Sequence, residues 1–84
     1  MKAKLFRGVL VSLLQCGGVA MPEAALISAA QILCRPLEPT DDDVRDAMKD
    51  LAAHQLISGV TDELTRERTW TLTTTGTHKA RSLR

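Results

Sequence analysis

Five aspartates within ten residues are the main chemical feature of this 84-residue chain: Asp41, Asp42, Asp43, Asp46 and Asp50. Carboxylate oxygens can bind a divalent cation, but three adjacent aspartates lack the alternating spacing and the glycine of a calcium loop. At the first turn of a helix the same carboxylates stabilise the positive end of the helix dipole, each by roughly 0.3–1 kcal/mol. We therefore predict that Asp41–Asp43 begin a helix and that no metal binds there.

No combination of residues predicts catalysis. His54 and His78 lie far apart in sequence with different neighbours, and no serine stands in a Gly-x-Ser-x-Gly setting. The chain also has no phosphate-binding glycine loop and no paired-cysteine metal motif. We expect a protein that is not an enzyme and that needs no cofactor.

The two cysteines, Cys16 and Cys34, are isolated in apolar surroundings. Buried, reduced thiols are the usual state of such cysteines in a cytoplasmic protein, and a disulfide between them is the alternative. Residues 5–14 are apolar, but the run is too short to span a bilayer. We expect a core helix there, no membrane segment and a cytoplasmic location.

Three helices are predicted before residue 56. Apolar residues recur at helical spacing over residues 3–16 and again over residues 22–34. Pro22 suits the first position of the second helix, where its missing N–H is harmless. Thr40 is a favourable N-cap for a third helix over residues 40–55.

Short strands are expected beside these helices. Val19–Met21 is short and apolar, which allows a strand of a single bridge. Residues 56–73 alternate in polarity on either side of a turn at Asp62–Thr65 and so predict a β-hairpin. Trp70 is expected to pack beneath this hairpin, against the first or the third helix. A short helix over residues 74–83 completes the chain.

This order of elements is the plan of a winged helix-turn-helix domain: three helices, a two-stranded β-wing and a short C-terminal helix. The predicted fold class is α+β, mainly helical, in a single domain over residues 1–84. Its core must be aliphatic, because Phe6 and Trp70 are the only aromatic residues.

Two stretches resemble small prokaryotic winged-helix regulators: TDDDVRDAMKDLAAHQLI at residues 40–57 and TWTLTTTG at residues 69–76. In those proteins a recognition helix leads into a Gly-Leu-Ile strand, and the wing closes on Leu-Thr-x-x-Gly, which Leu72–Gly76 matches. In length and order the whole chain also resembles small winged-helix proteins of Mu-like transposable phages and prophages. Gln55 departs from the pattern, since the regulators have glycine there, and this puts the conformation of that turn in question.

The resemblance implies a regulator that binds double-stranded DNA. Six cationic residues are the candidates for base or phosphate contacts: Arg45, Lys49, Arg66, Arg68, Lys79 and Arg81. Flanking phosphates would be held by the terminal cations Lys2, Lys4, Arg7 and Arg84. A homodimer is expected, because one module of this size neutralises few phosphates. The first helix offers a dimer face if part of its apolar surface stays uncovered.

The charge of the third helix favours a different partner. Its outward side carries three negative and two positive residues: Asp42, Arg45, Asp46, Lys49 and Asp50. A helix that reads DNA normally shows the opposite balance. The net charge of +1 by itself indicates neither a nucleic-acid nor a membrane partner. The alternative is therefore a protein-interaction module, in which a basic partner protein contacts Asp42, Asp46 and Asp50.

Overall fold

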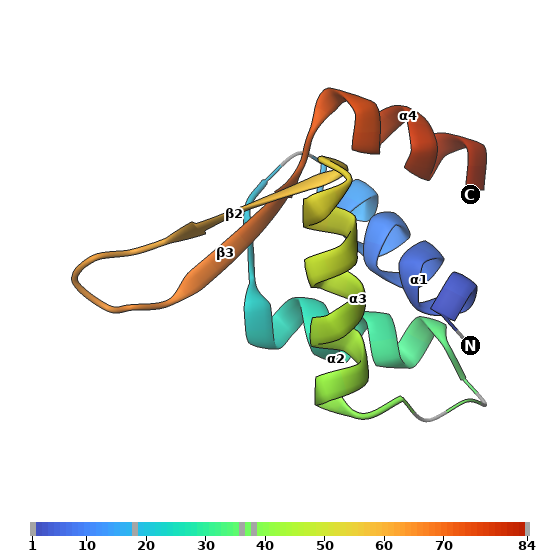
Figure 1. Cartoon of the computed structure of the whole chain (residues 1–84), viewed down its shortest axis with the longest axis horizontal. Helices are drawn as coiled ribbons and strands as arrows, with labels where there is room; N and C mark the ends of the chain where they lie inside the picture. Colours follow the sequence, from blue (N-terminus) through green and yellow to red (C-terminus); the bar gives the residue numbers. More distant parts are fainter. Residues whose placement is uncertain (1, 18, 36, 38, 84) are drawn as a thin grey trace.

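The computed structural model describes residues 2–17, 19–35, 37 and 39–83. In chain order the elements are α1 (Lys2–Gln15), β1 (Met21–Pro22), α2 (Glu23–Leu33), α3 (Asp41–Ala53), β2 (Ile57–Thr61), β3 (Arg68–Leu72) and α4 (Thr74–Leu83) (Figure 1). The described part of the chain is α+β and mainly helical, as the sequence predicts. Each helix begins and ends within two residues of its predicted range.

The apolar face of α1 forms the centre of the core. The side chains of this inward face are 3% exposed or less: Leu5, Val9, Leu10 and Leu13. They pack in one cluster with apolar residues of the other elements, and Phe6 and Leu14 are partly buried against it. α1 contacts α2, α3 and α4, and Phe6 and Leu14 on it keep part of their apolar surface exposed, so the dimer face on this helix stays a prediction. Neither α1 nor another helix in the described ranges is long and apolar enough to cross a membrane.

Local interactions set the start of α3. Thr40 Oγ1 accepts a hydrogen bond from the Asp43 N–H at 3.1 Å, and Asp43 Oδ2 accepts one from the Thr40 N–H at 3.0 Å. This reciprocal pair is a capping box, which satisfies two backbone donors that have no partner inside the helix. The prediction that Thr40 caps this helix is confirmed. The inward side of α3 is buried at Val44, Ala47, Met48 and Leu51.

The strands form one antiparallel sheet in the order β1–β3–β2. The predicted hairpin is present as β2 and β3, and β1 adds a third strand to it, with Met21 opposite Trp70 and Pro22 opposite Thr69. This strand overlaps the expected segment Val19–Met21 at one residue. Pro22 has the extended angles φ −58° and ψ 144° and occupies the N-cap position just before α2, not the first position of the helix. Because proline has no N–H to donate, it fits the edge position that β1 occupies.

Trp70 joins the sheet to the core. The residue is 5% exposed, and the prediction that it is buried is confirmed. Its strand, β3, packs against α1 and α2. On β2 it pairs with Gly59, where an added Cβ would meet the indole ring at 2.9 Å. The absence of a side chain at Gly59 therefore makes room for the ring.

Thr73 caps α4, and two small residues dock the helix. Thr73 Oγ1 accepts a hydrogen bond from the Gly76 N–H at 3.0 Å and donates one to the Gln55 carbonyl at 2.6 Å. The inward side of α4 is buried at Gly76 and Ala80. The helix packs on α1 at the end of the molecule away from the hairpin tip (Figure 1).

Candidate functional site

The outward side of α3 and the β2–β3 hairpin form the surface on which the sequence places most candidate contacts, and we name it the α3–hairpin surface. On α3 its charged residues are exposed, except for half-buried Asp50: Asp42, Arg45, Asp46, Lys49 and Asp50. On the hairpin they are all exposed: Asp62, Glu63, Arg66, Glu67 and Arg68. This surface therefore combines six carboxylates with four cations.

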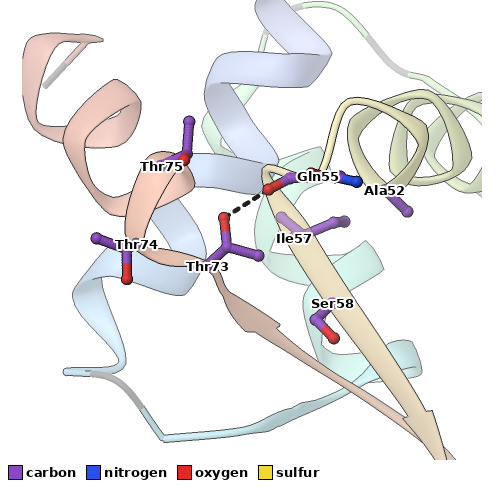
Figure 2. A pocket seen from close by; sticks show the side chains of 7 residues that line it. All are labelled: Ala52, Gln55, Ile57, Ser58, Thr73, Thr74 and Thr75. Atoms are coloured by element: carbon purple, nitrogen blue, oxygen red, sulfur yellow. Dashed lines mark hydrogen bonds between the residues drawn. The ribbon is translucent and has the colours of Figure 1, made fainter.

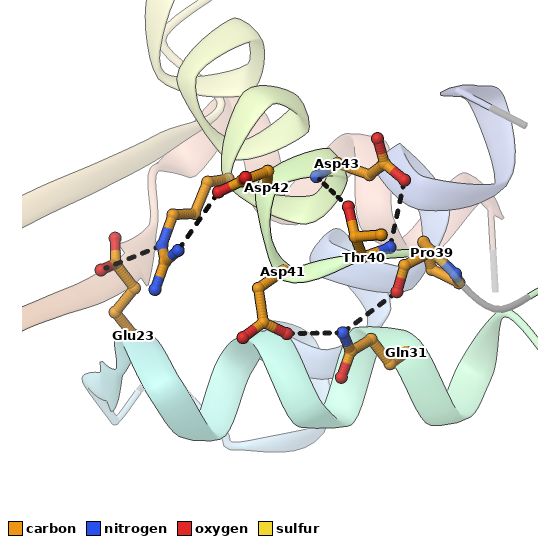
Figure 3. A network of polar contacts seen from close by, with 8 residues as sticks. Glu23, Gln31, Pro39, Thr40, Asp41, Asp42 and Asp43 are labelled. Atoms are coloured by element: carbon orange, nitrogen blue, oxygen red, sulfur yellow. Dashed lines mark hydrogen bonds and ion pairs between the residues drawn. The ribbon is translucent and has the colours of Figure 1, made fainter.

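Two aspartates at the start of α3 hold the helix in place. Asp41 Oδ1 accepts a hydrogen bond from Gln31 Nε2 of α2 at 2.8 Å, and the same nitrogen donates to the Pro39 carbonyl at 3.1 Å (Figure 3). Asp43 belongs to the capping box with Thr40. The prediction that these aspartates begin a helix is confirmed. Asp41 and Asp43 are engaged within the chain and are poor candidates for contacts to a partner.

Arg45, the first of the candidate cations, lies between two carboxylates. Its Nε is 3.9 Å from Glu23 Oε2 of α2, and its Nη1 is 3.5 Å from Asp42 Oδ1. Dashed lines at Glu23 and Asp42 in Figure 3 mark these two ion pairs. Glu23 Oε1 also accepts a hydrogen bond from Trp70 Nε1 at 3.4 Å. A phosphate that approached Arg45 would therefore meet two carboxylates that repel it.

Lys49, Asp46 and Asp42 of α3 stay accessible. Lys49 lies one turn beyond Arg45 and is exposed, and Asp46 three residues earlier is its neighbour on the helix surface. The side chain of Asp42 is 92% exposed despite its contact with Arg45. Alternating signs along this face leave no continuous cationic stripe for a nucleic-acid backbone.

The two arginines of the hairpin are held differently. The Arg68 guanidinium carbon lies 5.6 Å from the centroid of the Trp70 ring, and Arg68 Nε donates to Thr61 Oγ1 at 3.3 Å. The cation–π contact and the hydrogen bond hold Arg68 against the sheet. Arg66 is exposed in the hairpin loop, where its φ is 60°. Leu64 in the same loop is 94% exposed, so the tip presents an apolar side chain among charges.

Two candidate cations lie elsewhere, on α4, and both are exposed: Lys79 and Arg81. The structure thus separates the six candidates into four on the α3–hairpin surface and two on α4. Of the cations expected to hold flanking phosphates, Lys4 and Arg7 are exposed on α1. The side chain of Lys2 and all of Arg84 lie outside the described part of the chain.

An open hollow lies where the end of α3, the start of β2 and the first turn of α4 meet (Figure 2). Gln55, Ser58 and Thr73–Thr75 line most of its polar part, and the Thr73 hydroxyl is engaged with the Gln55 carbonyl. Among the described residues that line it, none is a carboxylate, histidine or cysteine. The described residues also contain no group of three or more potential metal ligands.

Both cysteines are free thiols, so the alternative of a disulfide is wrong. Cys34 is buried as predicted, and its Sγ donates to the Lys4 carbonyl at 3.4 Å. Cys16 is only half-buried, 3.7 Å from Met21 Sδ, because it follows the last turn of α1, and here the prediction of burial is wrong. Burial raises the pKa of the Cys34 thiol, and the charges of Lys4 and Arg7 oppose part of that rise.

Glu23 is the site residue that sequence reasoning missed. It joins Arg45 of α3 to Trp70 of β3, although Trp70 lies 47 residues further along the chain. The sequence offers only a carboxylate in the first turn of a helix, which is favourable there for the dipole alone.

No protein-family model, curated protein or solved structure matches this chain. The function must therefore be inferred from the chain's own surfaces.

Proposed function

We propose that the chain is a winged helix-turn-helix domain that binds double-stranded DNA and catalyses no reaction. One observation carries this proposal: α3 is buried on its inward side only, and the hairpin that follows it projects away from the helices (Figure 1). Three helices followed by a projecting hairpin are the plan of a winged helix-turn-helix domain, a fold that many DNA-binding proteins use. The resemblance to small proteins of Mu-like phages supports a regulatory role in a phage or prophage.

The third strand is compatible with this proposal. β1 is only two residues long and pairs with Trp70 and Thr69 of β3. Residues 62–67 at the hairpin tip remain unpaired with β1 and exposed, as in a two-stranded wing.

The test of DNA binding is fluorescence anisotropy of a labelled random-sequence duplex, titrated with the protein at low and at moderate salt. Non-specific DNA binding is typically in the range 10⁻⁴–10⁻⁶ M at physiological salt and weakens steeply as salt rises. We expect micromolar binding at low salt with such a dependence. Absence of binding at low salt would contradict the proposal.

A second candidate function is a protein-interaction module, and the α3–hairpin surface favours it. Here the side chain of Asp42 and the residue Leu64 are each more than nine-tenths exposed. A basic partner with an apolar pocket could contact the Asp42 carboxylate and also the Leu64 side chain. The same carboxylates weigh against DNA on this surface, because DNA binding takes most of its affinity from cations on phosphates.

A paired set of variants tests the second candidate. Immobilised protein is exposed to a bacterial lysate, and the captured proteins are quantified by mass spectrometry. A true partner is enriched by the wild type, lost with Leu64→Ser combined with Asp42→Asn, and kept by the control Lys79→Gln. A set of proteins that does not differ between the variants would eliminate this candidate.

A further inference from the structure

Given the proposed DNA binding, on which this step rests, we infer that duplex DNA contacts the α1–α4 surface and not the α3–hairpin surface. The α1–α4 surface consists of the exposed charged and ionisable residues of the two helices: Lys4, Arg7, His78, Lys79 and Arg81. The partner is the sugar–phosphate backbone of the duplex, which attracts cations irrespective of its base sequence.

The segregation of charge is the first observation that carries this inference. Neither α1 nor α4 contains an aspartate or a glutamate along its whole length. The α3–hairpin surface, in contrast, has more carboxylates than cations. Because phosphates are repelled by carboxylates and held by lysine and arginine, the α1–α4 surface is the more favourable site for a duplex.

The arrangement of cations on α4 is the second observation. Ala80 is fully buried and so marks the inward direction of the helix. At 3.6 residues per turn, Lys79 and Arg81 project about 100° to either side of Ala80, and His78 and Ser82 lie near the outward crest. The major groove is about 12 Å wide and admits an α-helix. With its crest in the groove, α4 would direct Lys79 and Arg81 toward the phosphates of opposite strands.

The start of α1 extends the cationic surface beyond α4. Arg7 Nε donates to the Leu83 carbonyl at 3.1 Å, which fixes the arginine beside the last turn of α4. A guanidinium has five N–H donors, so this bond leaves others for a phosphate. Lys4 lies one turn earlier on α1 and is exposed. Four cations can thus contact one duplex: Lys4, Arg7, Lys79 and Arg81.

The longest extent of the molecule is 36 Å, and α4 and the hairpin tip lie toward its two ends (Figure 1). If DNA is bound along α4 and does not reach the hairpin, the α3–hairpin surface stays free for the protein partner considered above.

The salt dependence of binding measures how many of these cations contact phosphates. Four contacts predict that log K falls with log salt at a slope of about −3.6. Affinity would then decrease roughly 150-fold between 50 and 200 mM salt. Loss of two contacts would halve the slope to about −1.8 and reduce the same decrease to about 12-fold.

Two variants with the same net charge test the inference in the anisotropy titration. Lys79→Gln with Arg81→Gln removes two cations from α4, and Lys49→Gln with Arg66→Gln removes two from the α3–hairpin surface. Far-UV circular dichroism and thermal melting confirm that both variants fold. We expect the α4 variant to lose about half of the salt slope and the α3–hairpin variant to keep the slope of the wild type.

The other outcomes separate the two proposals. If only the α3–hairpin variant loses slope, DNA binding stands and the inferred surface is wrong. Equal losses in both variants would mean attraction by net charge alone, which also overturns the inferred surface. No binding by the wild type at low salt would remove the proposed function together with this inference.

Discussion

At the residue scale, the turn between α3 and β2 holds Gln55 in the left-handed region, at φ 61°. The resemblance proposed for this chain predicts glycine at this position, and the turn keeps a glycine-like conformation with a glutamine in it. A left-handed conformation costs an L-residue roughly 1–2 kcal/mol, which glycine avoids. The strain is local, since Gln55 still accepts a hydrogen bond from Thr73 through its carbonyl.

Gln55→Gly should therefore stabilise the fold. Glycine relieves the strain but loses more chain entropy on folding, so the net gain expected is about 0.5–1 kcal/mol. Urea unfolding followed by circular dichroism measures it. Gln55→Ala is the control, because alanine keeps the strain and should give no gain. A destabilised Gln55→Gly variant would show that the side chain contributes more than the strain costs.

Residues of the candidate site were predictable only where their partners are near in sequence. The capping of α3 by Thr40 and Asp43 follows from a spacing of three residues, and the prediction is confirmed. The contacts of Glu23 with Arg45 and Trp70 depend on how α2, α3 and β3 pack, and no local pattern encodes that packing. The sequence therefore identified Arg45 as a candidate without showing that its charge is compensated.

At the element scale, the helices were predictable because their apolar residues repeat every three or four positions. The third strand was harder to predict for a physical reason. β1 has only two residues, too few to show alternation, and it is a strand only because Trp70 and Thr69 of β3 lie opposite. The predicted strand at 66–73 is observed as Arg68–Leu72, since Arg66 and its neighbour belong to the loop.

The docking of α4 depends on Gly76, the last residue of the Leu-Thr-x-x-Gly match. A Cβ at this position would collide with the carbonyl group of Leu56, which is backbone and cannot rotate away. Gly76→Ala should therefore destabilise the protein by about 1–3 kcal/mol and loosen α4 from the sheet. Urea unfolding measures the loss of stability, and hydrogen exchange of the α4 amides measures the loosening of the helix.

Thr75→Ala is the matched control for this prediction, because Thr75 is its exposed neighbour in the same turn. Substitutions at such surface positions usually change stability by no more than about 0.5 kcal/mol. If Gly76→Ala had the same free energy of unfolding as Thr75→Ala, the close approach of α4 to Leu56 would not be needed for docking. The DNA surface inferred on α4 would then tolerate movement of that helix.

At the scale of the whole molecule, a net charge of +1 conceals two surfaces of opposite character. Carboxylates outnumber cations on the α3–hairpin surface, and cations stand alone on α1 and α4. A two-fold dimer uses the same patch of both subunits, whereas a head-to-tail contact pairs two different surfaces and forms a ring or an open chain. Most of the apolar face of α1 lies in the core, and the homodimer expected from sequence stays a prediction.

This polarity predicts head-to-tail self-association that salt abolishes. The Debye length is about 30 Å at 0.01 M and about 8 Å at 0.15 M ionic strength, so opposite surfaces attract over a protein diameter only at low salt. Sedimentation velocity should show association that grows with concentration at 10 mM salt and is absent at 150 mM. Lys79→Gln with Arg81→Gln, or Asp42→Asn with Asp46→Asn, should each suppress this association.

A mixture of the two double variants should form pairs but not chains of three or more molecules, because each variant retains one intact surface. A dimer that persists at 150 mM salt in all variants would instead require an apolar interface, and the exposed side chains of Ile32 and Val60 would be the first to replace.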